Sequence, residues 1–312
     1  MARKKNFSFV SADGRTKIHA VRWMPEQEKP RAILQIVHGM IEYIERYELF
    51  AEYLCRMGYM VVGHDHLGHG RSIQSQEEWG FFAEKNPSDT LVADIHHLRL
   101  GIQKQYPDVP YYMMGHSMGS YMLRKYLIRH HGNLNGVIIM GTGYVPGAAT
   151  SFGKLFTKGM ARIFGWHHRS KLVEALTFGK SYAKFDRSGK DVYNSWLTRD
   201  AEIVREYRGQ PQCSFHFTLN GYRGLFEAVS EACDSRNIAR YPMELPIFMV
   251  SGEEDPVGDA GVGVRKVYEM YQNAGITDVT MKLYPNDRHE ILHELDKDVV
   301  YDDIYTWMED HR

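Results

Sequence analysis

The sequence is poor in several features that mark particular classes of protein. It contains only three cysteines in 312 residues, Cys55, Cys213 and Cys233, and no CxxC spacing joins them. An odd number of widely spaced cysteines argues against a disulfide framework and against a zinc site built on thiolates. We therefore expect reduced thiols and a cytoplasmic location.

Long hydrophobic runs and an excess of one charge are also missing. No stretch approaches the roughly 18 apolar residues of a membrane span, and residues 1–5 do not lead into the apolar segment of a signal peptide. Lysine plus arginine is 38 and aspartate plus glutamate is 39, so the net charge of -1 would not gather nucleic acid. The 43% hydrophobic content is that of an ordinary globular protein. The composition leaves the oligomeric state open.

Short apolar runs alternate with stretches of helical spacing through most of the chain. Two runs around the turn at Asp13-Gly14 predict an opening antiparallel hairpin. Later runs at 32–37, 59–63, 109–114 and 136–140 are almost continuously hydrophobic, which is typical of strands buried on both faces. Two further strands are predicted at 245–250 and 279–284. Helical spacing is found at 44–57, 88–105, 118–130 and 296–309. The pattern predicts an α/β fold with a mostly parallel central sheet flanked by helices.

The alternation stops after the sixth predicted strand. Residues 144–244 have mostly helical spacing, so we expect a helical lid, or cap, inserted into a core made of residues 1–143 and 245–312. One helix of this cap has an apolar stripe, with Lys154, Lys158 and Arg162 opposite it; the stripe consists of Phe152, Leu155, Phe156, Met160, Ile163 and Phe164. Two interpretations stay open, a buried face that lines an acyl tunnel and a face that makes peripheral contact with a membrane.

The segment Gly115-His116-Ser117-Met118-Gly119 is the strongest chemical signal. It follows an apolar run and opens a helical stretch, which is the context of a Gly-x-Ser-x-Gly nucleophile elbow. At the start of a helix the backbone N–H of Met118 can face a developing oxyanion. A second N–H donor is expected from Met40, because Gly39 lets the chain turn after the strand at 32–37.

A serine hydroxyl needs a base to take its proton, and the base needs an acid to orient it. Asp255 follows the run at 245–250 and His289 follows the run at 279–284, so both lie at the strand ends where open α/β sheets place ligands. We expect Ser117, Asp255 and His289 to form the catalytic set. The competing base is His293, which we place inside the following helix, and the competing acids are Glu253, Glu254 and Asp259.

A second cluster, His64, Asp65, His66 and His69, resembles a metal site. The glycines around it favour a loop at the end of a strand, in which polar side chains bond to the backbone. A serine mechanism needs no metal, and we expect neither a metal nor a cofactor.

These motifs together resemble the α/β-hydrolase superfamily, and within it the monoglyceride lipase and lysophospholipase branch of serine aminopeptidase-like hydrolases. The resemblance rests on the segments 37–43, 65–72, 115–120, 251–257 and 289–294, which occur in family order. It implies the order Ser117, Asp255, His289 for the catalytic residues and a structural role for the loop at 65–72. Met40 is larger than the residue that family members often have there, which predicts a narrower acyl pocket.

The sequence therefore predicts a serine carboxylic-ester hydrolase that cleaves a monoacylglycerol or lysophospholipid-like ester through an acyl-enzyme on Ser117. One alternative is an aminopeptidase of the proline iminopeptidase kind, which needs cap carboxylates to hold a free amine; candidates are Glu174, Asp186, Asp200, Glu202 and Glu206. The other is a non-catalytic ligand-binding protein on a hydrolase scaffold.

Overall fold

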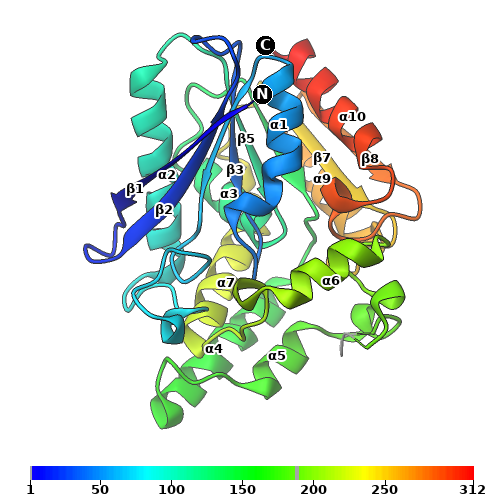
Figure 1. The fold of residues 1–312 in the computed structure, drawn as a ribbon. Coiled ribbons are helices and arrows are strands. Elements are labelled where there is room, and N and C mark those ends of the chain that lie inside the picture. The colour runs from blue at the N-terminus through cyan, green and yellow to red at the C-terminus, as the bar shows by residue number, and fades with distance from the viewer. Residues whose placement is uncertain (1, 187–189) are drawn as a thin grey trace.

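A single eight-stranded sheet forms the centre of the computed structural model, which describes residues 2–186 and 190–312 (Figure 1). Its strands are β1 (Arg3–Val10), β2 (Lys17–Met24), β3 (Ile33–Val37), β4 (Met60–His64), β5 (Tyr111–His116), β6 (Gly136–Met140), β7 (Ile247–Gly252) and β8 (Val279–Tyr284). They are arranged in the order β1-β2-β4-β3-β5-β6-β7-β8. The pairs β1–β2 and β2–β4 are antiparallel, and all other pairs are parallel. The predicted hairpin and mostly parallel sheet are confirmed.

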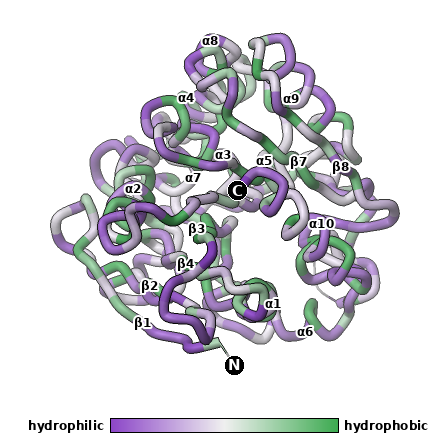
Figure 2. Tube along the Cα trace, turned by 90° about the horizontal axis from the view of Figure 1, so that it is seen from above, coloured by the Kyte–Doolittle hydropathy of each residue, from purple (hydrophilic) through white to green (hydrophobic). Residues whose placement is uncertain are grey.

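Helices cover both faces of this sheet. Ile33 and Met113 face one apolar layer, which includes α2 (Pro87–Gln105), α3 (Met118–Leu127) and α9 (Val262–Asn273). Their chain neighbours Leu34 and Met114 face the opposite layer, which includes α1 (Glu48–Arg56) and α10 (Lys297–Asp310). Figure 2 shows the layering from above, with α2 and α9 on one side of the strands and α1 and α10 on the other. Burial on both faces explains why these strands are hydrophobic along their whole length.

The chain between β6 and β7 is helical, as the spacing predicts. It forms α4 (Gly147–Phe164), α5 (Lys171–Thr177), α6 (Ala201–Gly209), α7 (Leu219–Ala232) and α8 (Ser235–Ile238). Helices α4, α5 and α6 lie at the end of the molecule opposite both termini (Figure 1). We keep the name cap for residues 144–244, of which 187–189 lie outside the described residues. Of the helices described, none is long and apolar enough to cross a membrane.

Helix α4 packs through small residues, joined by Phe156 and Met160 of its apolar stripe, which are partly buried against the core. Its buried residues are Thr150, Gly153, Thr157 and Ala161. A Cβ atom added at Gly153 would meet the Phe226 ring at 2.9 Å, so glycine lets α4 and α7 approach closely. The interpretation of the stripe as one buried face is therefore wrong for Leu155 and Ile163, whose side chains are 71% and 76% exposed.

Candidate active site

Ser117 stands at a sharp turn between β5 and α3. Its backbone has φ 53° and ψ -122°, a conformation that costs a non-glycine residue about 1–3 kcal/mol. The flanking glycines permit it: a Cβ at Gly115 would meet the Gly119 carbonyl oxygen at 2.5 Å, and one at Gly119 would meet that of Val37 at 2.0 Å. The Ser117 N–H also donates to the Met140 carbonyl at 3.0 Å. This is the geometry of the expected elbow.

The loop after β3 lies directly against this turn. A Cβ added at Gly39 would meet the Ser117 Cβ at 3.0 Å, and the Gly39 N–H donates to the Glu42 carboxylate. Met40 and Met118 both line the cavity described below. Met118 begins α3, where the first N–H groups of a helix lack partners within the helix. The two predicted N–H donors thus come from segments that meet at Ser117.

Asp255 and His289 form a buried hydrogen-bonded pair. The His289 Nδ1 atom lies 2.9 Å from Oδ2 and 3.0 Å from Oδ1 of Asp255, and both side chains are almost wholly buried. Burial alone would raise the pKa of Asp255, but the charge of His289 and hydrogen bonds from His289, the Val257 N–H and the Ser251 hydroxyl hold that pKa below its usual value. The carboxylate therefore stays ionised and fixes which imidazole nitrogen carries a proton.

The competing residues lie elsewhere. Glu253 and Asp259 are exposed, and Asp259 accepts a hydrogen bond from the Ser181 hydroxyl at 2.9 Å. Glu254 lies 3.9 Å from Arg288. The placement of His293 inside the last helix is wrong, because it belongs to a separate turn at Ile291–His293 before α10. There its Nε2 atom lies 3.0 Å from the Arg46 carbonyl oxygen.

Buried charges lie directly behind the site. Arg46 contacts both oxygens of Glu290, at 2.6 and 2.7 Å, and one oxygen of Glu42 at 3.0 Å. We call residues 287–296, which include His289, the histidine loop. His116 joins Glu42 to this loop, since its Nδ1 atom is 3.1 Å from Glu42 and its Nε2 atom is 3.2 Å from the His289 carbonyl oxygen. Burial would lower the pKa of His116, but Glu42 raises it above the usual value. This network holds the loops of Gly39 and His289 in one arrangement.

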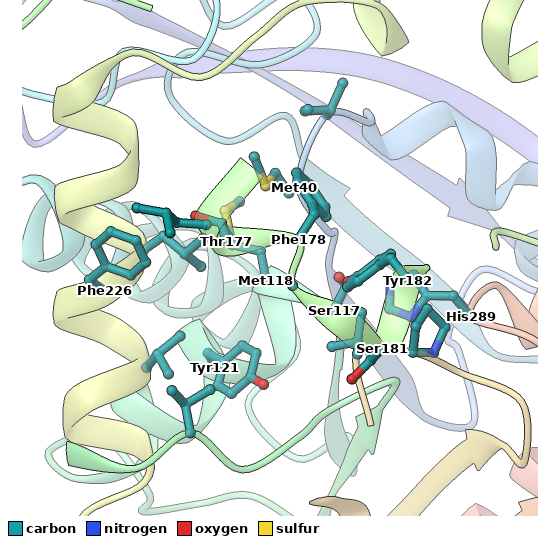
Figure 3. A pocket seen from close by; sticks show the side chains of 18 of the residues that line it. Met40, Ser117, Met118, Tyr121, Thr177, Phe178, Ser181, Tyr182, Phe226 and His289 are labelled. Atoms are coloured by element: carbon teal, nitrogen blue, oxygen red, sulfur yellow. The ribbon is translucent and has the colours of Figure 1, made fainter. Parts of the chain in front are cut away.

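A cavity of about 490 Å³ opens at Ser117 and His289. In Figure 3, Ser181 and Tyr182 lie beside these two residues, whereas Phe226 and Thr177 lie at the other side of the cavity. Most of the wall is apolar and comes from both the core and the cap, including Tyr121, Val145, Phe152, Phe156, Val173, Leu176, Leu225 and Val229. The charged side chains of the wall are Glu42 and Glu290, which both pair with Arg46. Sequence spacing indicated none of the cap contributors except Phe152 and Phe156.

Asp65 and His66 of the predicted histidine cluster make internal hydrogen bonds, whereas both ring nitrogens of His64 are buried without a hydrogen-bond partner among the described residues. Asp65 accepts from the backbone N–H groups of Ile44 and Arg71, both at 2.8 Å, and burial raises its pKa to about 7. The His66 N–H donates to Nε2 of His38 at 2.8 Å. Burial lowers the pKa of His66 to about 4 and that of His69 to about 3. These contacts agree with a structural loop.

Among the described residues, the acidic side chains of Asp287, Glu294 and Asp296 are spaced closely enough to hold an ion. The guanidinium of Arg199 already contacts all three, at 2.6 Å, 3.0 Å and 2.7 Å respectively. An arginine side chain thus supplies the positive charge at this position.

The carboxylates that an aminopeptidase would need lie away from the cavity. Glu174 pairs with His216 at 2.8 Å, Glu202 pairs with Arg205, and Asp200 caps the N-terminus of α6. Within residues 2–186 and 190–312, none of Glu174, Asp186, Asp200, Glu202 and Glu206 lines the cavity wall.

Comparisons with known proteins identify the relatives of the chain. The family model described as "Serine aminopeptidase, S33" matches residues 28–296. The chain is 24% identical to a monoacylglycerol lipase of Mycolicibacterium smegmatis over 99% of this chain and 98% of the relative. It is 25% identical to human monoglyceride lipase over 96% and 88%. The structure is also similar to that of a highly thermostable carboxyl esterase from Bacillus coagulans in complex with glycerol, with a TM-score of 0.90, 29% identity and 98% coverage of both chains.

Proposed function

The chain belongs to the serine aminopeptidase (S33) family of α/β-hydrolases and is a carboxylic-ester hydrolase, and from this premise we propose that it cleaves monoacylglycerols through an acyl-enzyme on Ser117. The observation that carries the proposal is the meeting of three features at one apolar cavity: the strained turn at Ser117, the Asp255–His289 pair and the N-terminus of α3. A protein that only bound a ligand would need neither the buried acid nor the oriented imidazole.

In the proposed reaction His289 takes the proton of the Ser117 hydroxyl while its oxygen bonds to the ester carbonyl carbon. The carbonyl electrons move onto oxygen, and the N–H groups of Met40 and Met118 stabilise that negative charge. Collapse of the intermediate breaks the ester C–O bond, and His289 gives its proton to the departing alcohol. Water then repeats the sequence to release the fatty acid. Asp255 keeps the imidazole in the required orientation throughout.

A neutral glyceride suits this cavity better than a lysophospholipid. The apolar wall of the core and cap accepts an acyl chain, while Ser181 and Thr177 supply hydroxyl groups. The charged wall residues, Glu42 and Glu290, both pair with Arg46, and among the described residues the wall offers no lysine or arginine side chain to a phosphate group. The relatives named monoacylglycerol and monoglyceride lipase, and the glycerol bound to the Bacillus coagulans esterase, support the same choice.

The test combines labelling of the nucleophile with a panel of substrates. A fluorophosphonate probe should label the wild type and not Ser117→Ala. The wild type should hydrolyse a monoacylglycerol at least tenfold more efficiently than the lysophosphatidylcholine with the same acyl chain. Labelling of Ser117→Ala would refute the assignment of the nucleophile. Release of arylamine from a prolyl arylamide in preference to ester hydrolysis would favour the aminopeptidase instead.

We further propose that residues 144–244 act as a cap that touches a lipid surface. Phe152 of α4 and Leu176 of α5 line the cavity and are 60% and 56% exposed, so the cavity opens within an apolar patch. The outer part of this patch consists of Leu155, Ile163, Phe164 and Leu172, all more than half exposed. Lys158 and Arg162 flank it, whereas Lys154 turns toward α7 and donates to Ser230. The free thiols support a cytoplasmic location.

Vesicle flotation tests this contact. Ile163→Asp should reduce flotation of the protein with anionic vesicles severalfold, because a charge opposes burial of the patch in the interface. Its melting temperature and its activity on a short p-nitrophenyl ester should stay close to wild type, since Ile163 is 76% exposed. Leu100→Asp is the matched control, because Leu100 is an exposed leucine of α2, outside the cap. Equal flotation of both variants and wild type would refute the lipid contact.

A further inference from the structure

A short segment of the cap is bound to the loop that carries His289. We call residues 193–200 the strap. The N–H of His289 donates to the Trp196 carbonyl at 3.4 Å, and the N–H of Glu290 donates to the Leu197 carbonyl at 2.7 Å. The Thr198 hydroxyl donates to the His293 carbonyl at 2.9 Å. These bonds join the strap to the backbone at His289, Glu290 and His293.

Charged side chains strengthen the same contact. Arg199 of the strap reaches Asp287 and Glu294, two carboxylates of the histidine loop whose side chains are fully buried. In the opposite direction, Arg288 donates to the carbonyl oxygens of Tyr193 and Ser195, at 3.0 and 2.6 Å. The position of Trp196 relative to His289 is therefore set by a network that does not involve the indole ring itself.

The indole of Trp196 lies against the imidazole of His289. The ring centroids are 5.1 Å apart and the planes are inclined by 37°. Tyr182 contacts Trp196 in turn, edge to face at 5.2 Å. Asp255 at its Nδ1 atom and the ring of His116 at 4.7 Å also face His289, with Glu42 behind His116, and Tyr182 lies beside it in Figure 3. Trp196 is the cap residue whose ring centroid lies 5.1 Å from that of the imidazole.

We propose that Trp196 is a positioning residue for the hydrolysis, which holds the His289 ring toward Ser117 and stabilises the imidazolium that forms when His289 takes the serine proton. An aromatic face attracts a cation, most strongly for indole, and the attraction increases where water is excluded. It acts on the charged imidazolium and much less on the neutral imidazole. The effect therefore falls on the transition state of each proton transfer rather than on substrate binding. The inference rests on the proposed function.

Two substitutions separate the effect of the aromatic face from the effect of the volume of the side chain. Trp196→Leu keeps an apolar side chain but removes the aromatic face, and Trp196→Phe keeps a weaker one. We expect kcat on a p-nitrophenyl ester to fall roughly five- to twentyfold in Trp196→Leu and less in Trp196→Phe, with KM changed less than twofold. The midpoint of the acidic limb of the kcat/KM profile should move down by about 0.5 to 1 pH unit in Trp196→Leu, because the protonated base is less stabilised.

The matched control is Phe178→Leu. Phe178 lines the same cavity and contacts Trp196 with ring centroids 6.2 Å apart. Because Phe178 lies on the cavity wall and contacts Trp196 and Tyr182, its loss should change KM and leave the acidic midpoint within about 0.2 pH unit of wild type. An equal shift of the midpoint in Phe178→Leu and Trp196→Leu would overturn the proposal, since the effect would then come from general packing. A wild-type kcat and midpoint in Trp196→Leu would overturn it as well.

A second measurement avoids any change of shape. The chain has five tryptophans, and fluorinated tryptophan can replace all of them while weakening the ring's attraction for a cation. Incorporation of fluorinated tryptophan should lower kcat roughly two- to threefold in the wild type and have no effect on kcat in Trp196→Phe. The same loss in both backgrounds would contradict the proposal. Failure of the proposed function is recognised separately, because the unlabelled wild type would then hydrolyse no ester or Ser117→Ala would keep the activity.

Discussion

Asp255 and His289 show how single residues at this site depend on their surroundings. The Asp255 carboxylate is fully buried, and yet four hydrogen-bond contacts from two side chains and one backbone N–H keep it ionised. A buried carboxylate with that many donors orients the imidazole without competing for its proton. The chemistry of the site therefore rests on an electrostatic arrangement that small changes of side chain can test.

His289→Ala should lower kcat on a p-nitrophenyl ester by roughly 10³-fold or more, because the proposed catalytic residues act as one unit. Asp255→Asn should also be severe, since an amide cannot hold the imidazole in the same protonation state. Thermal unfolding should be measured alongside, and His289→Ala should melt near the wild type. A greater loss in Asp259→Asn than in Asp255→Asn would move the acid to Asp259.

Prolonged treatment with a chelator should leave the wild-type activity intact.

At the scale of elements, the sequence indicates strands more clearly than helix packing. The strands β3 to β7 are buried on both faces, so each appears as a hydrophobic run that needs no knowledge of its neighbours. Ser117 and Asp255 could be predicted because each follows such a run, whereas His289 follows the half-buried strand β8. The packed face of α4 could not, because Gly153, Thr157 and Ala161 are too small to mark an apolar face by periodicity.

The strap could not be predicted from the sequence either. Its contacts join loops about 95 residues apart, as in the bond from Thr198 to His293, and loops have no hydrophobic period. The residue types at 196–200 give no indication of their partner. The separation of His293 from α10 was missed for a similar reason, because a turn of three residues is too short to have a pattern of its own.

The ion pairs of Arg199 with the histidine loop give a prediction at the scale of elements. Arg199→Met leaves two fully buried carboxylates, Asp287 and Glu294, without their cation. We expect the free energy of unfolding to fall by about 3 kcal/mol, because removal of one partner leaves a buried charge uncompensated. Urea unfolding of the variant would measure this.

Arg205→Met is the control for the same change of side chain. Arg205 pairs with Glu202 on the surface, where the two side chains are 47% and 85% exposed, so its loss should cost less than about 0.5 kcal/mol. Equal unfolding midpoints for the two variants would show that the strap does not stabilise the folded state. Activity should fall more in Arg199→Met, because the loop of His289 loses the Arg199 ion pairs that help to attach it to the cap.

The molecule as a whole contains many buried histidines. Burial is the leading cause of a lowered pKa in eight of them, His19, His38, His64, His66, His69, His96, His130 and His293. Each remains neutral in the folded protein at a pH where the unfolded chain binds a proton. Their contribution to stability is present above pH 6.5 and is lost as the pH falls toward the folded pKa values.

Three buried carboxyl groups have the opposite effect on the pH dependence of stability. Burial raises the pKa of Asp65 and Asp287 to about 7 and that of Asp94 to about 6. Asp287 also faces Glu294, Asp296 and Arg199. The folded state then keeps protons that the unfolded chain releases, so their contribution decreases as the pH rises from about 4 to 7. Because the histidines outnumber them, the net stability should fall on mild acidification.

Urea unfolding at pH 7.5 and pH 5 measures the balance. We expect a clearly lower midpoint at pH 5, since each neutral buried histidine contributes up to about 1.4 kcal/mol per pH unit between its folded and unfolded pKa values. His64→Leu should reduce the difference, because both ring nitrogens of His64 are buried without a hydrogen-bond partner. It should also stabilise the protein at pH 7.5 by about 1 kcal/mol. An unchanged or higher midpoint at pH 5 would contradict this account.

The attachment of the strap to the histidine loop has a consequence for protein engineering. Exchange of caps between related hydrolases treats residues 144–244 as a portable unit that can be spliced between β6 and β7. Here a transplanted cap would arrive without its partner surface at 287–296, and the recipient would keep a loop shaped for a strap that is gone. A chimera should therefore regain the activity of its donor only when residues 287–296 are exchanged together with the cap.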